Sequence, residues 1–214
     1  MKYKAVLFDF DGTVADTSPG IFESIKYALS KMNLPQLEDD ELRLFVGPPL
    51  AAAFSQYCRL NQEEANKAVE FYRENYSAGA LLNLNLYPGI MELLARLKSE
   101  GIKLAVCSSK PERFIKRILA SKGLDELFDF AACQNDDDRK ETKQELIERA
   151  CKNLNICTNE AIMIGDRHFD IEGAVKAGCD SIGAVYGFGS EDELTIAGAA
   201  FTAKSVKDIE KILL

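Results

Sequence analysis

The chain has 214 residues, of which 47% are hydrophobic and 28% charged, and its formal net charge at pH 7 is −8. A chain of this length buries roughly 70% of the surface that its unfolded form exposes, so its core needs neither disulfides nor a structural metal. The acidic balance argues against a protein that grips a nucleic-acid polymer, which requires a large basic surface. The six cysteines include no CxxC pair and His168 is the one histidine, so we expect reduced thiols and no zinc site.

No hydrophobic stretch has the length of a membrane span. The first apolar run ends in acidic residues and is too short for a signal peptide, and no later run approaches about twenty apolar residues. We therefore expect a cytoplasmic protein with no membrane partner.

Four short apolar runs, rich in β-prone residues, predict buried strands. They span residues 4–10, 102–107, 161–164 and 180–185. Amphipathic patterns between and after these runs predict helices at residues 90–99, 112–121, 143–153 and 171–177. Because strands and helices alternate, the expected fold class is α/β, with a Rossmann-like parallel sheet as its core.

Residues 17–84 interrupt this alternation. Apolar residues recur there at spacings of three and four with almost no strand signal, and proline and glycine breaks divide the stretch into about four helices. We therefore expect an α/β catalytic core formed by residues 1–16 and 85–214. Residues 17–84 would form an inserted α-helical cap domain that serves as a lid over a site.

Polar residues directly follow three of the predicted strands. Asp9 and Asp11 end the first, Ser108 and Ser109 end the second, and Asp166 ends the third. Ligands of open parallel sheets bind beyond the carboxyl ends of the strands. We therefore expect these side chains to meet at one edge of the sheet.

The acidic residues suggest a site for a hard cation. Side chains alternate along a strand, so Asp9 and Asp11 tend toward the same side, and Asp166 and Asp170 share one face of a starting helix. Mg²⁺ suits such a site, because it takes one or two carboxylates and completes its shell with water and phosphate oxygens. Turn formation and helix capping explain the same aspartates, so their spacing alone leaves both interpretations open.

Two further groups suit an anionic substrate. The Ser108 hydroxyl and the N–H groups that follow it offer donors to phosphate oxygens, although a serine there also suits a plain helix cap. Lys143 begins a predicted helix, where a lysine is usually solvated, and Lys140 lies close to it. Spacing alone does not select Lys143.

Together these segments resemble the four ordered motifs of the haloacid dehalogenase superfamily. They are DFDGT at 9–13, Ser108 in VCSSKP, Lys143 in RKETKQELI, and GDRHFD at 165–170. The inserted helices resemble the cap of the phosphoglycolate phosphatase, β-phosphoglucomutase and nucleotidase-like branches. The resemblance spans the whole chain and implies a Mg²⁺-dependent phosphatase that hydrolyses small phosphomonoesters through an aspartyl-phosphate intermediate.

The resemblance also implies roles for the four aspartates. Asp9 would attack phosphorus and become phosphorylated. Asp11 would protonate the leaving oxygen and then act as the base on the hydrolytic water. Asp9, the main-chain carbonyl of Asp11, and Asp166 would ligate Mg²⁺, and Asp170 would orient a water bound to the metal.

Substrate contacts follow from the same resemblance. Ser108 and Ser109 would bind the phosphoryl group, and Lys143 would balance the charge between that group and Asp9. Gly47, in the segment FVGPPL, resembles part of a cap loop that faces the active site, although a helix-breaking turn explains it equally well. Many relatives carry Lys-Pro-x-Pro near the third motif, whereas residues 138–143 here read DRKETK. We prefer Lys143 to Lys140 because it enters a clear amphipathic helix.

The natural substrate stays open at this level. The loop resemblance favours 5'-nucleotides as substrates, with phosphoglycolate as the alternative. The expected partner is therefore a small phosphorylated metabolite, and the protein itself is expected to be a monomer or a dimer. A sugar-phosphate mutase would use the same Asp9 and Asp11 and differ in the phosphoryl acceptor. A phosphoaspartate signalling switch would be smaller and lack the insertion. His168 is expected to be a partly exposed surface residue, and residues 186–190 are expected in a loop at the carboxyl edge of the sheet.

Overall fold

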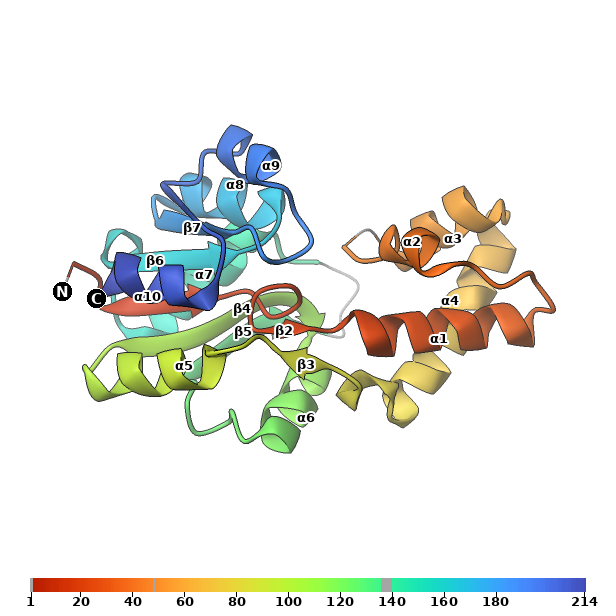
Figure 1. Ribbon diagram of the computed structural model, residues 1–214, viewed down its shortest axis with the longest axis horizontal. Helices are drawn as coiled ribbons and strands as arrows, with labels where there is room; N and C mark the ends of the chain where they lie inside the picture. The colour runs from red at the N-terminus through yellow and green to blue at the C-terminus, as the bar shows by residue number, and fades with distance from the viewer. Residues whose placement is uncertain (1, 48, 136–139) are drawn as a thin grey trace. The chain divides into compact units, whose positions relative to one another are not determined.

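The computed structural model describes residues 2–47, 49–135 and 140–214. The chain forms two compact units, one of Met1–Asp16 with Leu86–Leu214 and one of Thr17–Asn85. The first unit contains the main sheet, and the second is helical (Figure 1). Two short strands, β2 (Ala15–Asp16) and β3 (Asn85–Leu86), pair where the chain passes from one unit to the other.

A six-stranded parallel sheet forms the core of the first unit, in the order β5-β4-β1-β6-β7-β8. Its strands are β1 (Ala5–Phe8), β4 (Lys103–Pro111), β5 (Phe130–Gln134), β6 (Ala161–Gly165), β7 (Asp180–Ala184) and β8 (Phe201–Ala203). Phe8 is in register with Val106 of β4 and Ile164 of β6. The strand order reverses at β1, so these three strands finish side by side at the kind of switch point where ligands bind.

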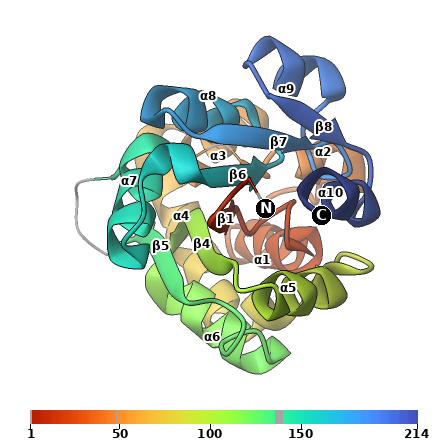
Figure 2. The same ribbon diagram turned by 90° about the vertical axis from the view of Figure 1, so that its left-hand side faces the viewer.

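Helices cover both faces of this sheet. They are α5 (Ile90–Ser99), α6 (Glu112–Lys122), α7 (Lys143–Leu154), α8 (His168–Ala177), α9 (Glu191–Ile196), α10 (Val206–Leu213) and the short 3-10 helix η2 (Thr158–Glu160). Figure 2 shows α7 and α8 on one face and α5, α6 and α10 on the other. Leu146 and Ile147 of α7 pack into the same buried cluster as Leu7 and Met163 of the sheet. Because both faces are covered, the central strands are apolar throughout.

The second unit is built of helices. They are α1 (Ser18–Lys31), α2 (Asp39–Arg43), α3 (Leu50–Cys58), α4 (Gln62–Ala78) and the 3-10 helix η1 (Ala80–Leu82). Phe45 and Phe54 pack edge to face with ring centroids 5.1 Å apart. A Cβ atom at Gly20 would lie 2.1 Å from the Ala80 carbonyl oxygen, so α1 can approach η1 only with glycine at that position. Across the described residues of both units, no helix is long and apolar enough to cross a membrane.

The predicted α/β class with a parallel sheet is confirmed, and the four predicted strands correspond to β1, β4, β6 and β7. The prediction missed two strands of the sheet, β5 and β8. Both are outer strands with weak sequence signals: Phe130 and Ala131 are only half-buried, and β8 has three residues of which Phe201 is exposed. The helix expected from Ile171 begins one turn earlier, at His168, because Asp170 accepts a hydrogen bond from the Arg167 N–H at its start.

Candidate active site

The Lys143 ammonium lies between two carboxylates at the carboxyl ends of the central strands. Its Nζ is 2.6 Å from Asp170 Oδ1 and 3.1 Å from Asp9 Oδ1, and it donates a hydrogen bond to the Cys107 carbonyl oxygen at 2.9 Å. The exposed fractions of these side chains are 6% for Lys143, 2% for Asp170 and 13% for Asp9. A charged group is therefore held away from solvent by three oxygen acceptors.

Two glycines allow this approach. A Cβ atom at Gly173 of α8 would lie 2.7 Å from Lys143 Cβ, and one at Gly165 would lie 2.3 Å from Asp170 Cβ. Real Cβ atoms do not come this close to other heavy atoms. The two helices α7 and α8 can therefore bring the lysine and the aspartate together only because these positions have no side chain.

Three buried carboxylates gather beside the ammonium. Oxygen atoms of Asp9, Asp166 and Asp170 all lie within 4.8 Å of one another. Asp166 is held by the Phe188 N–H, which donates to Oδ2 at 2.8 Å, and by the Thr13 hydroxyl, which donates to Oδ1 at 3.4 Å. The group offers only oxygen ligands, which hard cations prefer.

Burial changes the acid–base properties of this group. It raises the pKa of Asp9 to about 6; the Lys143 ammonium opposes the rise, and the Asp170 and Asp11 carboxylates add to it. Burial, with the negative charges of Asp170 and Asp9, also raises the pKa of Asp166 well above its usual value. For Lys143, burial acts to lower the pKa, but the two carboxylates outweigh it and raise the pKa. The carboxylates outnumber the ammonium, so negative charge remains uncompensated at this point.

Asp11 lies apart from this carboxylate group and pairs with a second lysine. Lys110 Nζ is 2.7 Å from Asp11 Oδ1, and the side chains are 7% and 25% exposed. The sequence reasoning did not assign Lys110 to the site. The available signal was its place in SSKP, at the end of the strand next to the one that Asp11 follows. Asp11 is thus held by a cation while remaining partly accessible to solvent.

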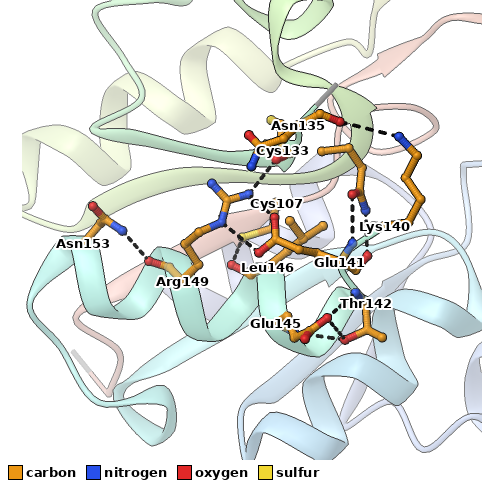
Figure 3. Close-up of polar contacts among 11 residues, drawn as sticks. Cys107, Cys133, Asn135, Lys140, Glu141, Thr142, Glu145, Leu146, Arg149 and Asn153 are labelled. Atoms are coloured by element: carbon orange, nitrogen blue, oxygen red, sulfur yellow. Dashed lines mark hydrogen bonds and ion pairs between the residues drawn. The ribbon is translucent and has the colours of Figure 1, made fainter. Parts of the chain in front are cut away.

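The remaining predicted site residues fall in different places. Ser108 is buried on β4 and its Oγ accepts a hydrogen bond from the Lys110 N–H at 3.3 Å, whereas the next residue, Ser109, is exposed. Gly47 belongs to the second unit and is exposed, with a φ of 107°. Its contact with substrate stays a prediction. Lys140 donates to the Asn135 carbonyl oxygen at 3.5 Å (Figure 3), so Lys143 is the one of the two that contacts Asp9.

The loop that follows β7 packs against the first motif. A Cβ atom at Gly12, whose φ is +79°, would lie 2.1 Å from Asp166 Oδ2, and one at Gly187 would lie 2.3 Å from the Gly12 carbonyl oxygen. The Tyr186 hydroxyl donates to the Thr13 carbonyl oxygen at 2.8 Å. The loop therefore supports Asp166 and the DFDGT turn, a role that turn chemistry alone did not predict.

His168 is held by an acidic residue of α9. Glu193 Oε1 accepts from the His168 N–H at 2.9 Å and from Arg167 Nε at 2.9 Å, and it lies 2.8 Å from His168 Nδ1. Burial acts to raise the pKa of Glu193, but these contacts with His168 and Arg167 hold it at about 2. Glu193 thus fastens the first residues of α8, the helix that carries Asp170. The imidazole is 34% exposed, which agrees with the partly exposed surface position expected for it.

Comparison with known proteins defines the class. A family model described as haloacid dehalogenase-like hydrolase matches residues 6–184, and the chain belongs to this family. A 5'-nucleotidase of Pseudomonas aeruginosa is 36% identical over 91% of this chain and 88% of that protein. The tyrosine-protein kinase PtkA of Mycobacterium tuberculosis is 34% identical over 87% of this chain, which spans 64% of that protein. A crystal structure of a predicted phosphatase from Clostridium acetobutylicum is 40% identical, with a TM-score of 0.89 and coverage of 100% of this chain and 99% of the other.

These comparisons confirm the predicted family and the predicted enzyme class, a phosphatase that hydrolyses phosphoric monoesters.

Proposed function

We propose that the protein is a Mg²⁺-dependent phosphatase that forms an aspartyl-phosphate at Asp9 and acts on 5'-nucleotides. The observation that carries this proposal is the position of the Lys143 ammonium between Asp9 and Asp170, beside a third buried carboxylate, Asp166. A nucleophilic carboxylate, a fixed cation and an oxygen-lined cation site are the parts that phosphoryl transfer through aspartate requires.

The residues present fit a bound Mg²⁺. Asp9, Asp166 and the main-chain carbonyl of Asp11 would hold the cation, and Asp170 would orient a water bound to it. All of these groups offer oxygen atoms, and the three buried carboxylates give the site an excess of negative charge. When bound, the cation supplies positive charge to the oxygens of the transferring phosphoryl group. The raised pKa values of Asp9 and Asp166 support this assignment, because burial and the neighbouring carboxylates raise them, and a nearby divalent charge would stabilise the ionised forms.

Asp9 and Asp11 would divide the chemistry between them. A carboxylate oxygen of Asp9 attacks phosphorus, so that a phosphorus–oxygen bond forms to Asp9 and the bond to the ester oxygen breaks. Asp11, which is 25% exposed and can take up a proton from solvent, gives that proton to the departing oxygen. In the second step the ionised Asp11 removes a proton from water, whose oxygen attacks phosphorus and releases inorganic phosphate from Asp9.

Lys143, Ser108 and Ser109 would bind the phosphoryl group. Lys143 is already desolvated and fixed, so its charge interacts strongly with the phosphoryl oxygens and needs little rearrangement as the reaction proceeds. The hydroxyls of Ser108 and Ser109 lie at the carboxyl end of β4, next to β1. Gly47 of the second unit is proposed to contact the remainder of the substrate, in line with a cap that chooses the substrate.

Nucleoside 5'-monophosphates are the proposed substrates because the relative named 5'-nucleotidase aligns over nearly the whole chain. Phosphoglycolate is the alternative. We also propose that the protein acts in the cytoplasm as a monomer or dimer. All six cysteines are free thiols, which suits a reducing compartment.

Phosphate release from a panel of phosphomonoesters tests this function. The panel contains nucleoside 5'-monophosphates, phosphoglycolate and sugar phosphates, each with Mg²⁺ and with EDTA, and compares wild type with Asp9→Asn. We expect Mg²⁺-dependent release that is fastest with a nucleotide and is lost in the variant. Release that persists in Asp9→Asn would refute Asp9 as the nucleophile. A folded, Mg²⁺-loaded wild type that hydrolyses no ester, but transfers phosphate from ATP to tyrosine, would favour the chemistry named for the mycobacterial relative instead.

A further inference from the structure

A polar network at the start of α7 lies outside the groups assigned to the reaction. Its members are Gln134 at the end of β5, Glu141 just ahead of α7, and Arg149 within α7. Figure 3 shows the Arg149 guanidinium reaching both Glu141 and Cys133. The network therefore joins the carboxyl end of an outer strand to the helix whose first residue is Lys143.

The Gln134 side chain holds the backbone of Glu141. Its Oε1 accepts from the Glu141 N–H at 3.0 Å, and its Nε2 donates to the Glu141 carbonyl oxygen at 2.6 Å. Gln134 is 5% exposed and belongs to β5, which pairs with β4. Because the side-chain amide matches the donor and the acceptor of one residue, the chain is fastened to the sheet two residues before Lys143.

Arg149 holds the same residue through its side chain. Its Nε lies 3.2 Å from Glu141 Oε1 and its Nη2 lies 2.9 Å from Oε2, so the guanidinium and the carboxylate meet in two parallel contacts. Nη2 also donates to the Cys133 carbonyl oxygen at 2.5 Å. The two side chains are 27% and 22% exposed. These contacts fix both the position and the rotation of α7 against β5.

The capping hydrogen bonds at the start of α7 do not hold the helix on β5. Thr142 Oγ1 accepts from the Glu145 N–H at 3.3 Å, and the Glu145 carboxylate accepts from the Thr142 N–H at 2.8 Å. This reciprocal capping determines which residue begins the helix. These two hydrogen bonds join residues at the start of the helix to each other, so by themselves they do not determine where the helix lies on the sheet.

We propose that Gln134, Glu141 and Arg149 are positioning residues of the active site. They hold the first turn of α7 on β5 and thereby place the Lys143 ammonium between Asp9 and Asp170. A lysine side chain is a flexible stem, so its ammonium returns to one point only when its backbone is fixed. This inference rests on the proposed function, because it assigns the network to the reaction through Lys143.

Arg149→Met tests the proposal, with Arg96→Met as the matched control. Arg96 of α5 also makes an ion pair within the first unit, 2.7 Å from Glu210, but far along the chain from α7. In Arg149→Met we expect kcat for Mg²⁺-dependent phosphate release to fall by about 10- to 100-fold, with KM within about twofold of wild type. Arg96→Met should leave kcat unchanged. Arg149→Lys, which keeps the charge, should recover part of the loss.

A double-variant comparison separates positioning from a general structural effect. If Arg149 acts through Lys143, Arg149→Met should lower kcat in the wild type and have no further effect in Lys143→Met. A crystal structure of Arg149→Met should show Lys143 Nζ displaced from both carboxylates. Equal losses in the two backgrounds, or an unchanged kcat together with unchanged Lys143 contacts, would overturn the proposal.

Loss of folding in Arg149→Met and loss of activity in the wild type are distinguished by separate measurements. If Arg149→Met does not fold, Gln134→Met is measured in the same way, because Glu141, the residue that Gln134 holds, is only half-buried. If the wild type releases no phosphate from any ester of the panel, the proposed function fails. The positions of Lys143 in the crystal structures of wild type and variant then decide the positioning role by themselves.

Discussion

The two edges of the main sheet carry lysine–carboxylate pairs of the same length in opposite surroundings. At the edge of the sheet where the strands begin, Lys2 Nζ lies 2.6 Å from Asp180 Oδ2, and the side chains are 68% and 42% exposed. At the carboxyl edge, Lys143 Nζ lies 2.6 Å from Asp170, and the side chains are 6% and 2% exposed. Water and salt screen the first pair, whereas the second interacts through a medium of much lower dielectric constant.

Burial, and not distance, therefore decides what each pair does. An exposed pair forms and breaks at little cost in free energy, and it contributes little to stability. Lys143 and Asp170 have lost most of their hydration and depend on their partners, so the removal of one partner leaves an uncompensated charge. The same desolvation makes fixed charges effective on a phosphoryl group. The buried charges at the carboxyl edge thus lower the stability of the fold but suit catalysis, whereas the exposed pair does neither. The following variants test this difference between the two edges.

Lys143→Met should have the largest effect. It removes the cation proposed to meet the phosphoryl group, so we expect kcat to fall by about 100- to 1000-fold. It also leaves Asp170 and Asp9 without their buried partner, so the free energy of unfolding at pH 7 without metal should fall by about 3 kcal/mol. Phosphate release and urea unfolding measure the two effects. Lys140→Met is the matched control, and an equal loss of activity there would contradict the assignment of Lys143.

Asp9→Asn should raise the stability of the metal-free protein at neutral pH. Burial raises the pKa of Asp9 from its ordinary value of 3.8 to about 6, so between these values the folded state binds more protons than the unfolded state. The contribution of Asp9 to wild-type stability is therefore full below pH 4 and is lost as the pH rises through about 6. Asparagine does not ionise, so at pH 7 the variant should be more stable by about 3 kcal/mol, the free energy that corresponds to this difference in pKa.

Urea unfolding in EDTA from pH 4 to pH 8 measures this effect. The two proteins should converge near pH 4, and Mg²⁺ should narrow the difference at pH 7 by stabilising the wild type. A wild type that is the more stable protein at pH 7 in EDTA would show that Asp9 is not an unfavourable buried charge.

Lys110→Met should have a smaller effect on activity than the change at Lys143. Lys110 is buried but its partner Asp11 is 25% exposed, so water can replace part of the lost ion pair. Asp11 would lose its orientation, and we expect kcat to fall by about tenfold. The measurement is kcat with a substrate whose leaving group needs protonation, compared with p-nitrophenyl phosphate, whose leaving group does not. A loss that is equal for both substrates would argue against a role through Asp11.

Lys2→Met should have the smallest effect. The pair with Asp180 is exposed and lies at the opposite edge of the sheet, so kcat should be unchanged and the unfolding midpoint nearly so. Phosphate release and thermal unfolding with and without 0.5 M salt, a concentration of the order that screens surface charges, provide the check. A loss of activity at this position would mean that the two edges are coupled in a way that burial does not explain.

The sequence predicted the site best at the ends of the central strands, where an apolar run is followed directly by catalytic residue types. The central strands are apolar on both faces and end abruptly in polar residues, so the meeting of Asp9 and Asp166 could be expected from the order of the motifs. The outer strands β5 and β8 were missed because their side chains are short or partly exposed. Strands this short, in which buried and exposed residues do not alternate, give neither a long apolar run nor the period-2 pattern that predicts a strand.

Side-chain pairing was the part that sequence could not supply. The Lys143–Asp170 contact depends on the close approach that Gly173 allows, and the Lys110–Asp11 pair depends on the adjacency of β4 and β1. Each partner lies far from the other along the chain. Their distances follow from packing, which spacing in one sequence does not encode.

The most direct test of the account is to trap the phosphoryl group on Asp9. In Asp11→Asn, p-nitrophenyl phosphate should still react in the first step, because its leaving group needs no acid, while the second step should be slow for lack of a base. After acid quenching, we expect one phosphoryl group per protein, located by peptide mass spectrometry on Asp9. A burst of nitrophenolate with no phosphoryl group on Asp9, or with the group on another residue, would contradict it.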